Sequence, residues 1–343
     1  MKIDIFCHIT PDKYLAALEK KISPEVNKDL PSQWLPALKD LDLRFTVMDN
    51  FPDMVQVLTV TNPPVETILN VQDAIDLSKI ANDELAELID KHPDRFVGAA
   101  ACLPMNDMDA ALKEAERALN ELNFNGVQIF TNIMGKPLDS PEFFPLYELM
   151  SQYDLPIWIH PFFQSIGSVA KSKDDFADYR VFTGKKDHAW AMARAAFDLP
   201  AASALAMTRL VYGKVFDLYP KVKFIIHHCG ADIPFFFNRI QMHYLMFGEK
   251  EKNDLGLKKP VPDYFKMFYV DTALHGNVPG LMCGYEIYGA DHILFGTDAP
   301  FGSENGLWPL RMTVDSVEKM AITDAERKMI YEDNARSLMR LKV

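Results

Sequence analysis

Four short apolar segments, far apart in the chain, each end in a residue that can bind a metal ion or move a proton. They are Ile3–His8, Pro156–His160, Val222–His228 and His292–Asp298. Imidazole and carboxylate groups are common ligands of divalent metals, and imidazole also titrates near neutrality. In a barrel of parallel strands the C-terminal ends of the strands meet at one face, which holds the active site. The four endings therefore predict one shared site.

The rest of the chain supplies the elements that would position these ends. Short apolar runs alternate with stretches of helical period, which is typical of parallel α/β architecture. Candidate strands are 2–7, 54–59, 96–102, 126–130, 157–160, 224–228, 268–271 and 292–296, and candidate helices are 65–92, 107–122, 141–153, 189–212, 233–247 and 323–339. Eight parallel strands close a barrel. The sequence thus predicts an α/β fold, a (β/α)8 barrel in one domain over residues 1–343 with a C-terminal helical extension.

Two stretches, 11–40 and 162–187, fit neither type of element. They follow the first and fifth candidate strands, at the face where barrels carry their substrate-binding loops. We expect long loops there, and we expect those loops to determine specificity.

Composition excludes several classes of protein. The 343 residues carry a formal net charge of −12 without a basic run, so neither nucleic acid nor an anionic membrane is an expected partner. No apolar stretch approaches the roughly 20 residues that cross a bilayer, and the N-terminus resembles a strand rather than a signal peptide. Four cysteines without CxxC spacing predict free thiols in a cytoplasmic protein. The 23 Phe and 17 Met favour large apolar contacts, including a subunit interface.

Strand alternation orients the side chains near the first and sixth endings. Phe6 and His8 are expected to point into the barrel mouth, whereas Ile5 and Cys7 face the helices. At the sixth ending only one of two adjacent histidines can then enter the site, and His228 is preferred because its loop runs directly into the next helix.

Each candidate also has a purely structural explanation. A histidine near a strand end is often buried and hydrogen-bonded, and Asp298 could cap the turn before Pro300. Four such residues at four strand ends nevertheless favour a site. His188 and His275 lie in expected loops near the mouth and are candidates for substrate contact. His227 and His292 are expected to be structural.

At these residues the sequence resembles the amidohydrolase superfamily, in the branch of 2-amino-3-carboxymuconate-6-semialdehyde decarboxylase and the resorcylate decarboxylases. The resemblance covers nearly the whole chain, and its blocks around His228 and Asp298 are the most specific. The matching segments are IDI…H at 3–8, RFVG at 95–98, FNGVQI at 124–129, IHP at 159–161, YP…HCG…IPF…RI at 219–240, FGTD…P at 295–300 and NA at 334–335.

The resemblance implies a distorted TIM barrel that holds one divalent metal ion, with zinc expected first and manganese or iron as alternatives. By position, the metal ligands fall on His8, His160 and Asp298. His228 matches a histidine that donates a proton, so His228 and Asp298 are the expected catalytic residues. Arg239 matches an arginine that reaches the substrate carboxylate of a neighbouring subunit, which implies a homodimer or a higher homo-oligomer.

The chain departs from this family at Phe6, where relatives have a His or Glu ligand. A phenyl ring cannot coordinate a metal, and we expect Phe6 instead to line the mouth and contact a flat substrate. Two imidazoles and one carboxylate remain, a set used by catalytic zinc and by mononuclear iron sites. Arg44 is a further candidate for an anion contact.

Three functions remain open from the sequence. The preferred hypothesis is metal-dependent non-oxidative decarboxylation of a small carboxylated aromatic or enoic acid, that is, of a small anionic organic substrate. The alternative is a hydrolase or hydratase, such as a lactonase of the same superfamily. The third is a barrel that has lost catalysis and serves as a binding protein, an idea supported only by Phe6.

Overall fold

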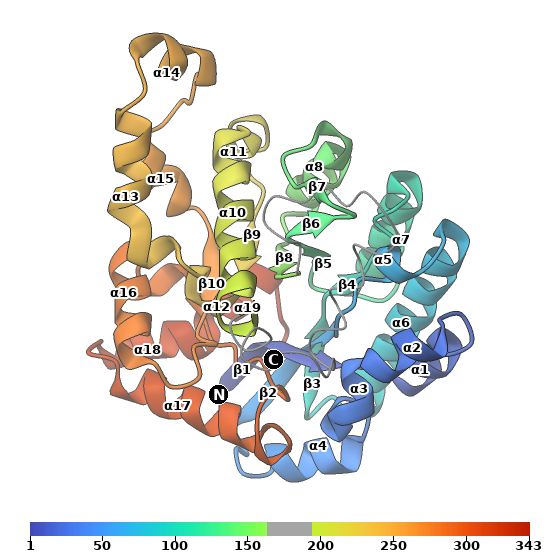
Figure 1. Ribbon diagram of the computed structural model, residues 1–343. Helices are drawn as coiled ribbons and strands as arrows, with labels where there is room; N and C mark the ends of the chain where they lie inside the picture. Colours follow the sequence, from blue (N-terminus) through green and yellow to red (C-terminus); the bar gives the residue numbers. More distant parts are fainter. Residues whose placement is uncertain (163–193) are drawn as a thin grey trace.

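The computed structural model describes residues 1–162 and 194–343, and parallel strands form its centre (Figure 1). Pairing follows the order of the chain, in one sheet of β1–β2–β3 and a second of β4–β5–β8–β9–β10–β11. The strands are β1 (Lys2–Ile9), β2 (Met54–Val60), β3 (Phe96–Ala99), β4 (Ala101–Cys102), β5 (Val127–Phe130), β8 (Ile157–His160), β9 (Phe224–Ile226), β10 (Tyr269–Asp271) and β11 (Ile293–Leu294). All of these pairings are parallel.

Two junctions join the two sheets into a closed barrel. β3 and β4 are one strand interrupted at Ala100, whose amide donates to the Leu58 carbonyl at 3.0 Å. On the other side, β1 contacts the segment that begins with β11. The Ile5 amide donates to the Phe295 carbonyl at 3.0 Å, and the His8 amide donates to the Ala299 carbonyl at 2.7 Å. The eight predicted strands are therefore confirmed, as is the distorted TIM barrel.

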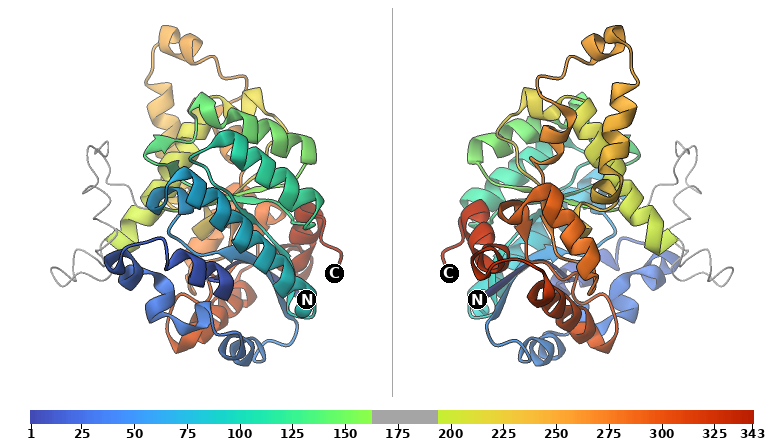
Figure 2. Two further views of the ribbon diagram at one scale, coloured as in Figure 1. Left: turned by 90° about the vertical axis from the view of Figure 1, so that its right-hand side faces the viewer. Right: turned by 90° about the vertical axis from the view of Figure 1, so that its left-hand side faces the viewer.

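Helices surround the barrel, and α13 and α14 extend beyond the rest of the molecule (Figures 1 and 2). A hairpin of β6 (Asn132–Ile133) and β7 (Lys136–Pro137) follows β5. The helices are α1 (Asp12–Leu18), α2 (Pro24–Asp29), α3 (Pro31–Trp34), α4 (Leu41–Met48), α5 (Val65–Ile68), α6 (Val71–Lys91), α7 (Met108–Asn120), α8 (Phe144–Tyr153), α10 (Leu199–Tyr212), α11 (Val215–Leu218), α12 (His227–Gly230), α13 (Ile233–Leu245), α14 (Glu249–Leu255), α15 (Val261–Phe265), α16 (Val278–Tyr288), α17 (Leu307–Lys319), α18 (Asp324–Lys328) and α19 (Asn334–Met339).

Local capping explains several of these bounds. Asp107 caps α7 by accepting from the Ala110 amide at 2.9 Å, and Thr323 forms a capping box with Glu326 at the start of α18. The predicted helix over 65–92 is instead two helices, because the Asn70 side chain caps α6 and ends the preceding turn.

The two expected loops have different outcomes. The prediction of a loop over 11–40 is wrong, because α1, α2 and α3 occupy most of it, with prolines at the first turns of α2 and α3. The other expected loop, 162–187, lies outside the described residues except for Phe162.

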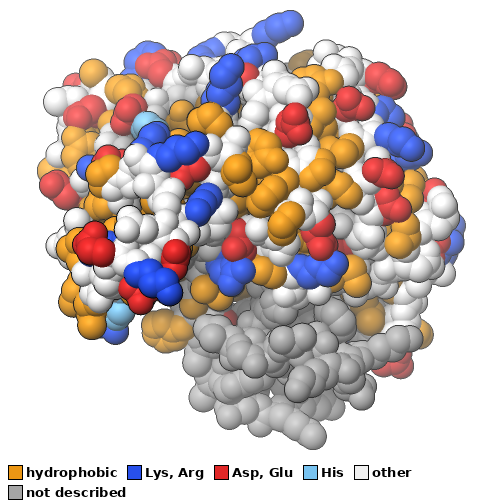
Figure 3. Space-filling view, turned by 90° about the horizontal axis from the view of Figure 1, so that it is seen from above, with side chains coloured by type: hydrophobic (Ala, Val, Ile, Leu, Met, Phe, Trp, Pro, Cys, Tyr) orange, Lys and Arg blue, Asp and Glu red, His pale blue; other side chains and the backbone are white. Residues whose placement is uncertain are grey.

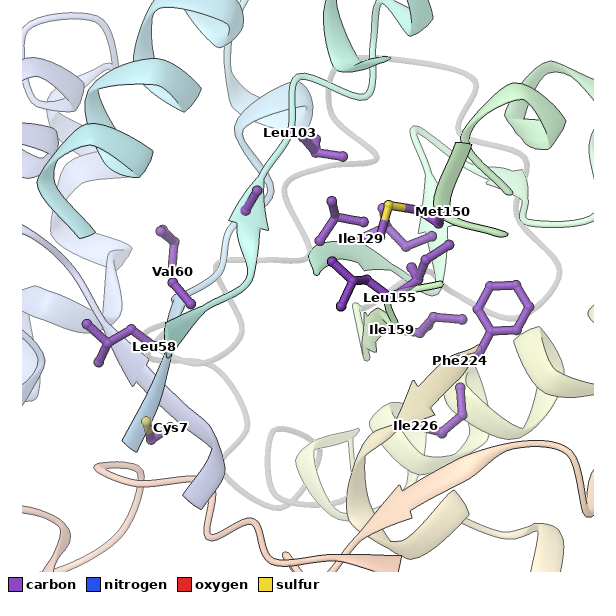
Figure 4. Close-up of a cluster of buried hydrophobic side chains, with 14 of the residues drawn as sticks. Cys7, Leu58, Val60, Leu103, Ile129, Met150, Leu155, Ile159, Phe224 and Ile226 are labelled. Atoms are coloured by element: carbon purple, nitrogen blue, oxygen red, sulfur yellow. The ribbon is translucent and has the colours of Figure 1, made fainter. Parts of the chain in front are cut away.

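Alternation along the strands produces two apolar layers. Inside the barrel, Ile3, Val57, Trp158 and Leu294 belong to one buried cluster. The opposite faces of the same strands pack against the helices, as Leu58, Ile159 and Ile226 do in Figure 4. Strands buried on both faces are typical of a parallel barrel.

β1 breaks the alternation just below its functional end. Its register against β2 shifts between Asp4 and Cys7, and the Phe6 amide donates to the Asp4 carboxylate at 3.2 Å. Ile5 and Phe6 therefore both belong to the inner cluster, whereas Cys7 belongs to the outer one. The predicted orientation of Cys7 is confirmed. That of Ile5 is wrong, because a bulge adds a residue to the strand.

The charged side chains at the surface are of mixed sign. Among the described residues, no helix is long and apolar enough to cross a membrane. On the face seen in Figure 3, Lys and Arg side chains are scattered among Asp and Glu rather than gathered into a basic patch.

Glu66, on α5, makes the stability of the protein depend on pH. It is buried, one of its carboxylate oxygens has no hydrogen-bond partner among the described residues, and burial raises its pKa from 4.5 to about 8. The folded state thus keeps this proton to higher pH than the unfolded chain. Its contribution to stability is complete below pH 4.5 and is lost as the pH rises to about 8.

Replacing Glu66 with Gln removes the titration while keeping the shape. We expect the unfolding free energy of the wild type to fall by about 2–3 kcal/mol more than that of Glu66→Gln between pH 6 and pH 9. Urea denaturation at the two pH values measures this difference. If the unfolding free energies of the two proteins fall equally between pH 6 and pH 9, Glu66 is not the group that titrates.

Candidate active site

Asp298 is the point where several barrel strands converge. The carboxylate lies just after β11, with its Oδ1 atom 3.3 Å from Nε2 of His8 at the end of β1. Its Oδ2 atom lies 3.6 Å from Nε2 of His228, after β9, and 3.7 Å from Nε2 of His275, after β10. Residues separated by up to 290 positions in the sequence thus share one carboxylate, as the strand endings predicted.

His160 and Phe6 complete the floor of this cluster. The ring of His160, the last residue of β8, lies 5.0 Å from the ring of His8. The Phe6 ring lies 4.8 Å from His8, 5.8 Å from His160 and 5.6 Å from His228. Phe6 is fully buried beneath these imidazoles. The expectation that it lines the mouth and contacts substrate therefore does not hold in this structure.

A hydrogen-bond network from inside the barrel wall orients the end of β11. The buried Asp4 carboxylate accepts from the Thr297 hydroxyl at 2.7 Å and from the Thr297 amide at 3.0 Å. The Asp298 amide in turn donates to the Phe6 carbonyl at 2.8 Å. Gly296 permits this approach, since a Cβ there would lie 2.9 Å from Cβ of Phe6 and 3.0 Å from Cβ of Asp271.

The backbone is strained where the side chains meet. His228, His275 and Asp298 have φ values of 56°, 49° and 62°, in the left-handed region. Such conformations cost on the order of 1–3 kcal/mol for residues with a side chain and are concentrated at functional sites. At these three positions, the conformation directs a histidine or an aspartate toward one common point.

The sixth strand ends earlier than predicted, and this brings a second histidine to the site. β9 stops at Ile226, and His227 and His228 lie in the short helix α12. Strand alternation therefore does not apply to them. His228 lies beside Asp298, whereas His227 packs against Phe6 and His160. His227 is fully buried, stacks on Phe6 at 3.5 Å and contacts the Asp271 carboxylate at 2.7 Å through Nδ1.

Electrostatics divide these groups into a charged pair and neutral imidazoles. Burial alone would raise the pKa of Asp298, but contacts with His228 and His8 hold it far below its usual range. Burial alone would lower the pKa of His228, but Asp298 raises it above its usual value. For His160, burial and the neighbouring His8 and His227 lower the pKa well below the usual value.

Hydrogen bonds place a proton on Nδ1 of both His8 and His160. The Thr59 hydroxyl donates to the Cys7 carbonyl at 2.9 Å, so it can only accept, at 3.2 Å, the proton on Nδ1 of His8. Nδ1 of His160 donates to the Pro161 carbonyl at 2.7 Å. With Nδ1 carrying the tautomeric proton, Nε2 is in each ring the atom available to a metal ion, since histidine binds metals as the neutral imidazole.

The donor set fits a divalent metal ion. Nε2 of His8 is buried without a hydrogen-bond partner and lies 3.3 Å from a carboxylate oxygen of Asp298. Two ligands at about 2.1 Å from a tetrahedral zinc ion stand about 3.4 Å apart. Within residues 1–162 and 194–343, no group of three or more His, Cys, Asp or Glu side chains is already arranged to hold a metal. Asp298 instead contacts the histidines directly.

Aromatic side chains also lie beside the cluster, and no periodic pattern in the sequence indicated them. Phe301 lies 5.4 Å from the His8 ring and 6.0 Å from Trp34, which is exposed. Trp308 stacks near His275 at 6.2 Å. The only indication in the sequence that Phe301 lies near the site is its position three residues after Asp298.

Other candidates lie elsewhere. Arg44 is buried behind β1, where it donates to the His8 carbonyl at 2.6 Å and to Gln56, so the anion contact expected of it is wrong. Arg239 lies exposed on α13, beside a groove shared with α10. His292 stacks on Tyr269 at 4.6 Å, away from the site. His188 lies outside the described residues.

A closed parallel barrel with imidazoles and a carboxylate at its C-terminal face defines a class of metal-dependent barrel enzymes. The chain matches the family described as Amidohydrolase over residues 3–341. It therefore belongs to the amidohydrolase family, as the sequence motifs predicted.

Individual relatives lie in the expected branch of this family. A gamma-resorcylate decarboxylase from Polaromonas sp. (strain JS666 / ATCC BAA-500) is 31% identical over 322 residues, which cover 92% of each chain. A 2-amino-3-carboxymuconate-6-semialdehyde decarboxylase from Dictyostelium discoideum is 27% identical over 319 residues, covering 88% of this chain and 82% of the relative.

A solved structure of a decarboxylase is also similar to this chain over its whole length. A dihydroxybenzoic acid decarboxylase from Polaromonas sp. JS666, with bound manganese and the inhibitor 2-nitroresorcinol, has a TM-score of 0.78 to this chain. It is 27% identical, and the similarity covers 100% of this chain and 97% of the other. The predicted branch is therefore confirmed. The manganese in the Polaromonas structure supports the expectation of a divalent metal ion at this site.

Removing two expected ligands tests the metal site. The double variant His8→Ala, Asp298→Ala loses an imidazole and the shared carboxylate, so we expect it to purify without the near-stoichiometric divalent metal of the wild type. Elemental mass spectrometry measures the content, and His292→Ala is the matched control because His292 lies away from the site. Equal metal in the double variant and the wild type would place the ion elsewhere.

Proposed function

We propose that this protein is a metal-dependent non-oxidative decarboxylase of a small carboxylated aromatic acid. The observation that carries the proposal is the contact between His228, a histidine with a raised pKa, and the Asp298 carboxylate at the mouth of the barrel. Such a histidine is a proton donor close to neutral pH. The decarboxylase relatives support the same reaction class.

His228 would supply the proton that starts the reaction. It protonates the ring carbon that bears the carboxylate, and the bond from that carbon to the carboxylate then breaks. Carbon dioxide leaves, the electron pair of the broken bond returns to the ring, and neutral His228 takes a proton from solvent. Asp298 keeps His228 protonated before the transfer, because the ion pair favours the charged imidazole.

His8, His160 and Asp298 would hold the divalent ion, which supplies positive charge for the substrate carboxylate and an adjacent oxygen. Zinc stays the expected ion from the sequence, and the manganese in the Polaromonas structure makes manganese the second candidate. The nearby Phe301 and Trp308 would favour a flat substrate, since their rings border the approach to His8 and His275.

Substitution of the proton donor tests the mechanism. We expect His228→Asn to lower kcat for decarboxylation by about 10²–10⁴-fold, the usual contribution of a positioned general acid. Metal content should stay close to that of the wild type, because His228 is outside the proposed ligand set. Release of carbon dioxide from a panel of hydroxybenzoates and carboxymuconates is the measurement.

His92→Asn is the control for this comparison, since His92 precedes β3 at the opposite end of the barrel. Wild-type turnover in His228→Asn would overturn the role of His228. Incorporation of labelled water into the product, without carbon dioxide, would replace the decarboxylase by the hydratase or hydrolase alternative.

We propose further that the protein is a homo-oligomer that associates through α10 and α13. These two helices border a groove lined by Leu205, Phe236, Arg239 and Ile240. Leu205 is 53% exposed, and Phe235, next to Phe236, is 80% exposed. Contiguous exposed apolar side chains are typical of an interface. Arg239 at its edge would then be available to a partner's substrate.

Charges placed in this groove should separate the subunits. We expect Leu205→Glu, Phe236→Glu to be monomeric by multi-angle light scattering, because burial of two unpaired carboxylates is unfavourable. Val71→Glu is the control, as Val71 is also exposed but lies on α6. A wild type that is itself monomeric, or a double variant with the wild-type mass, would refute the interface.

A further inference from the structure

His227 has the environment of a metal ligand rather than of a structural histidine. Its side chain is fully buried, and its Nδ1 atom lies 2.7 Å from Oδ2 of Asp271, which is also fully buried. Because a carboxylate at neutral pH can only accept, Nδ1 carries the proton. A histidine that binds a metal typically donates its other ring N–H to a carboxylate in this way.

The other ring nitrogen of His227 is unpaired. Nε2 is buried and has no hydrogen-bond partner among the described residues. A polar atom buried without a partner costs about 1–3 kcal/mol. Asp271 and the stacking on Phe6 fix the ring, but neither gives Nε2 a partner.

The His227 ring lies beside one of the proposed metal ligands, His160. The His227 ring lies 5.7 Å from the His160 ring, and both rings contact Phe6. The Phe6 ring is nearly parallel to His227, with an interplanar angle of 13°, and meets His8 edge-on at 81°. Phe6 thus packs against both His227 and His8 while offering no donor of its own.

We propose that Nε2 of His227 is a further ligand of the divalent metal, beside His8, His160 and Asp298, and that Asp271 positions it. The ligand set then contains three imidazoles and one carboxylate. The donor that Phe6 cannot provide on β1 is supplied by the adjacent ring on α12. This inference rests on the proposed metal site, but not on the reaction catalysed there.

Counting the histidine ligands directly is the decisive experiment. The wild-type protein, labelled with 15N-histidine, is loaded with ¹¹³Cd²⁺ as the only metal, and the cadmium resonance is examined for one-bond couplings to imidazole nitrogen. Three coupled nitrogens are expected, and two remain in His227→Asn. His228→Asn, the neighbouring histidine on α12, should keep all three. Two couplings in the wild type, or no bound cadmium, would overturn the proposal.

Affinity measurements give a second readout that does not depend on activity. Asp271→Asn should weaken Zn²⁺ binding by about 10–100-fold in competition with a chelating dye, the usual effect of losing the partner of a ligand. His227→Asn should weaken it at least as much. Introducing Phe6→His into the His227→Asn protein should recover at least about 10-fold, because the two rings are in contact.

The outcomes separate this inference from the proposed function. Unchanged Zn²⁺ affinity in folded His227→Asn would give His227 a structural role only and overturn the inference. If three nitrogens couple to cadmium but the protein releases no carbon dioxide, His227 is supported as a metal ligand and the proposed decarboxylase activity is rejected. If His227→Asn does not fold, the coupling counts in the wild type and in His228→Asn still decide.

Discussion

The seam between the first and last strands is the interaction on which the site depends. It is formed by backbone hydrogen bonds from Ile5 and His8 to the segment after β11 and is reinforced by Asp4, whose carboxylate holds both the amide and the hydroxyl of Thr297. The carboxylate is fully buried, and its pKa is raised to about 7, chiefly by loss of solvent. Closing the barrel at this seam places Asp298 against His8.

The seam also explains how strain is tolerated at the site. Three left-handed residues carrying side chains, His228, His275 and Asp298, lie at the ends of three strands. An isolated loop would relax away from such conformations, since each is costly. Here each lies within four residues of the end of a buried barrel strand, so the scaffold determines the conformation. The side chains consequently converge without a long loop to support them.

The sequence predicted the barrel well because its strands are buried on both faces. Short continuous apolar runs between helical stretches are the direct signal of such strands, and each of the eight was located. The convergence of His8, His160, His228 and Asp298 followed from the same signal, because the ends of parallel strands meet at one face. Neither inference required side-chain detail.

What the sequence did not show depends on backbone irregularities. The bulge in β1 turns Ile5 inward beside Phe6, and the early end of β9 places both His227 and His228 on a short helix. A period of two residues is assumed in any alternation argument, and a one-residue change reverses every later orientation. Tertiary contacts, including the stacking of His227 on Phe6 and its contact with Asp271, accompany these irregularities, and they are not local in sequence.

The burial of Phe6 changes how the departure from the family pattern at this position is interpreted. A phenyl ring open to the mouth would indicate an apolar binding surface, and a missing ligand would favour a barrel without catalysis. Phe6 instead lies under four imidazoles, in contact with each of them. Its effect is to exclude water from beneath the histidines and to lower the local dielectric constant, which strengthens the attraction between Asp298 and any cation beside it. We propose that substrate selection falls instead to groups beside the cluster, among them His275, Phe301 and Trp308. A chain that replaces a donor by a buried ring can therefore keep the charge arrangement that decarboxylation requires.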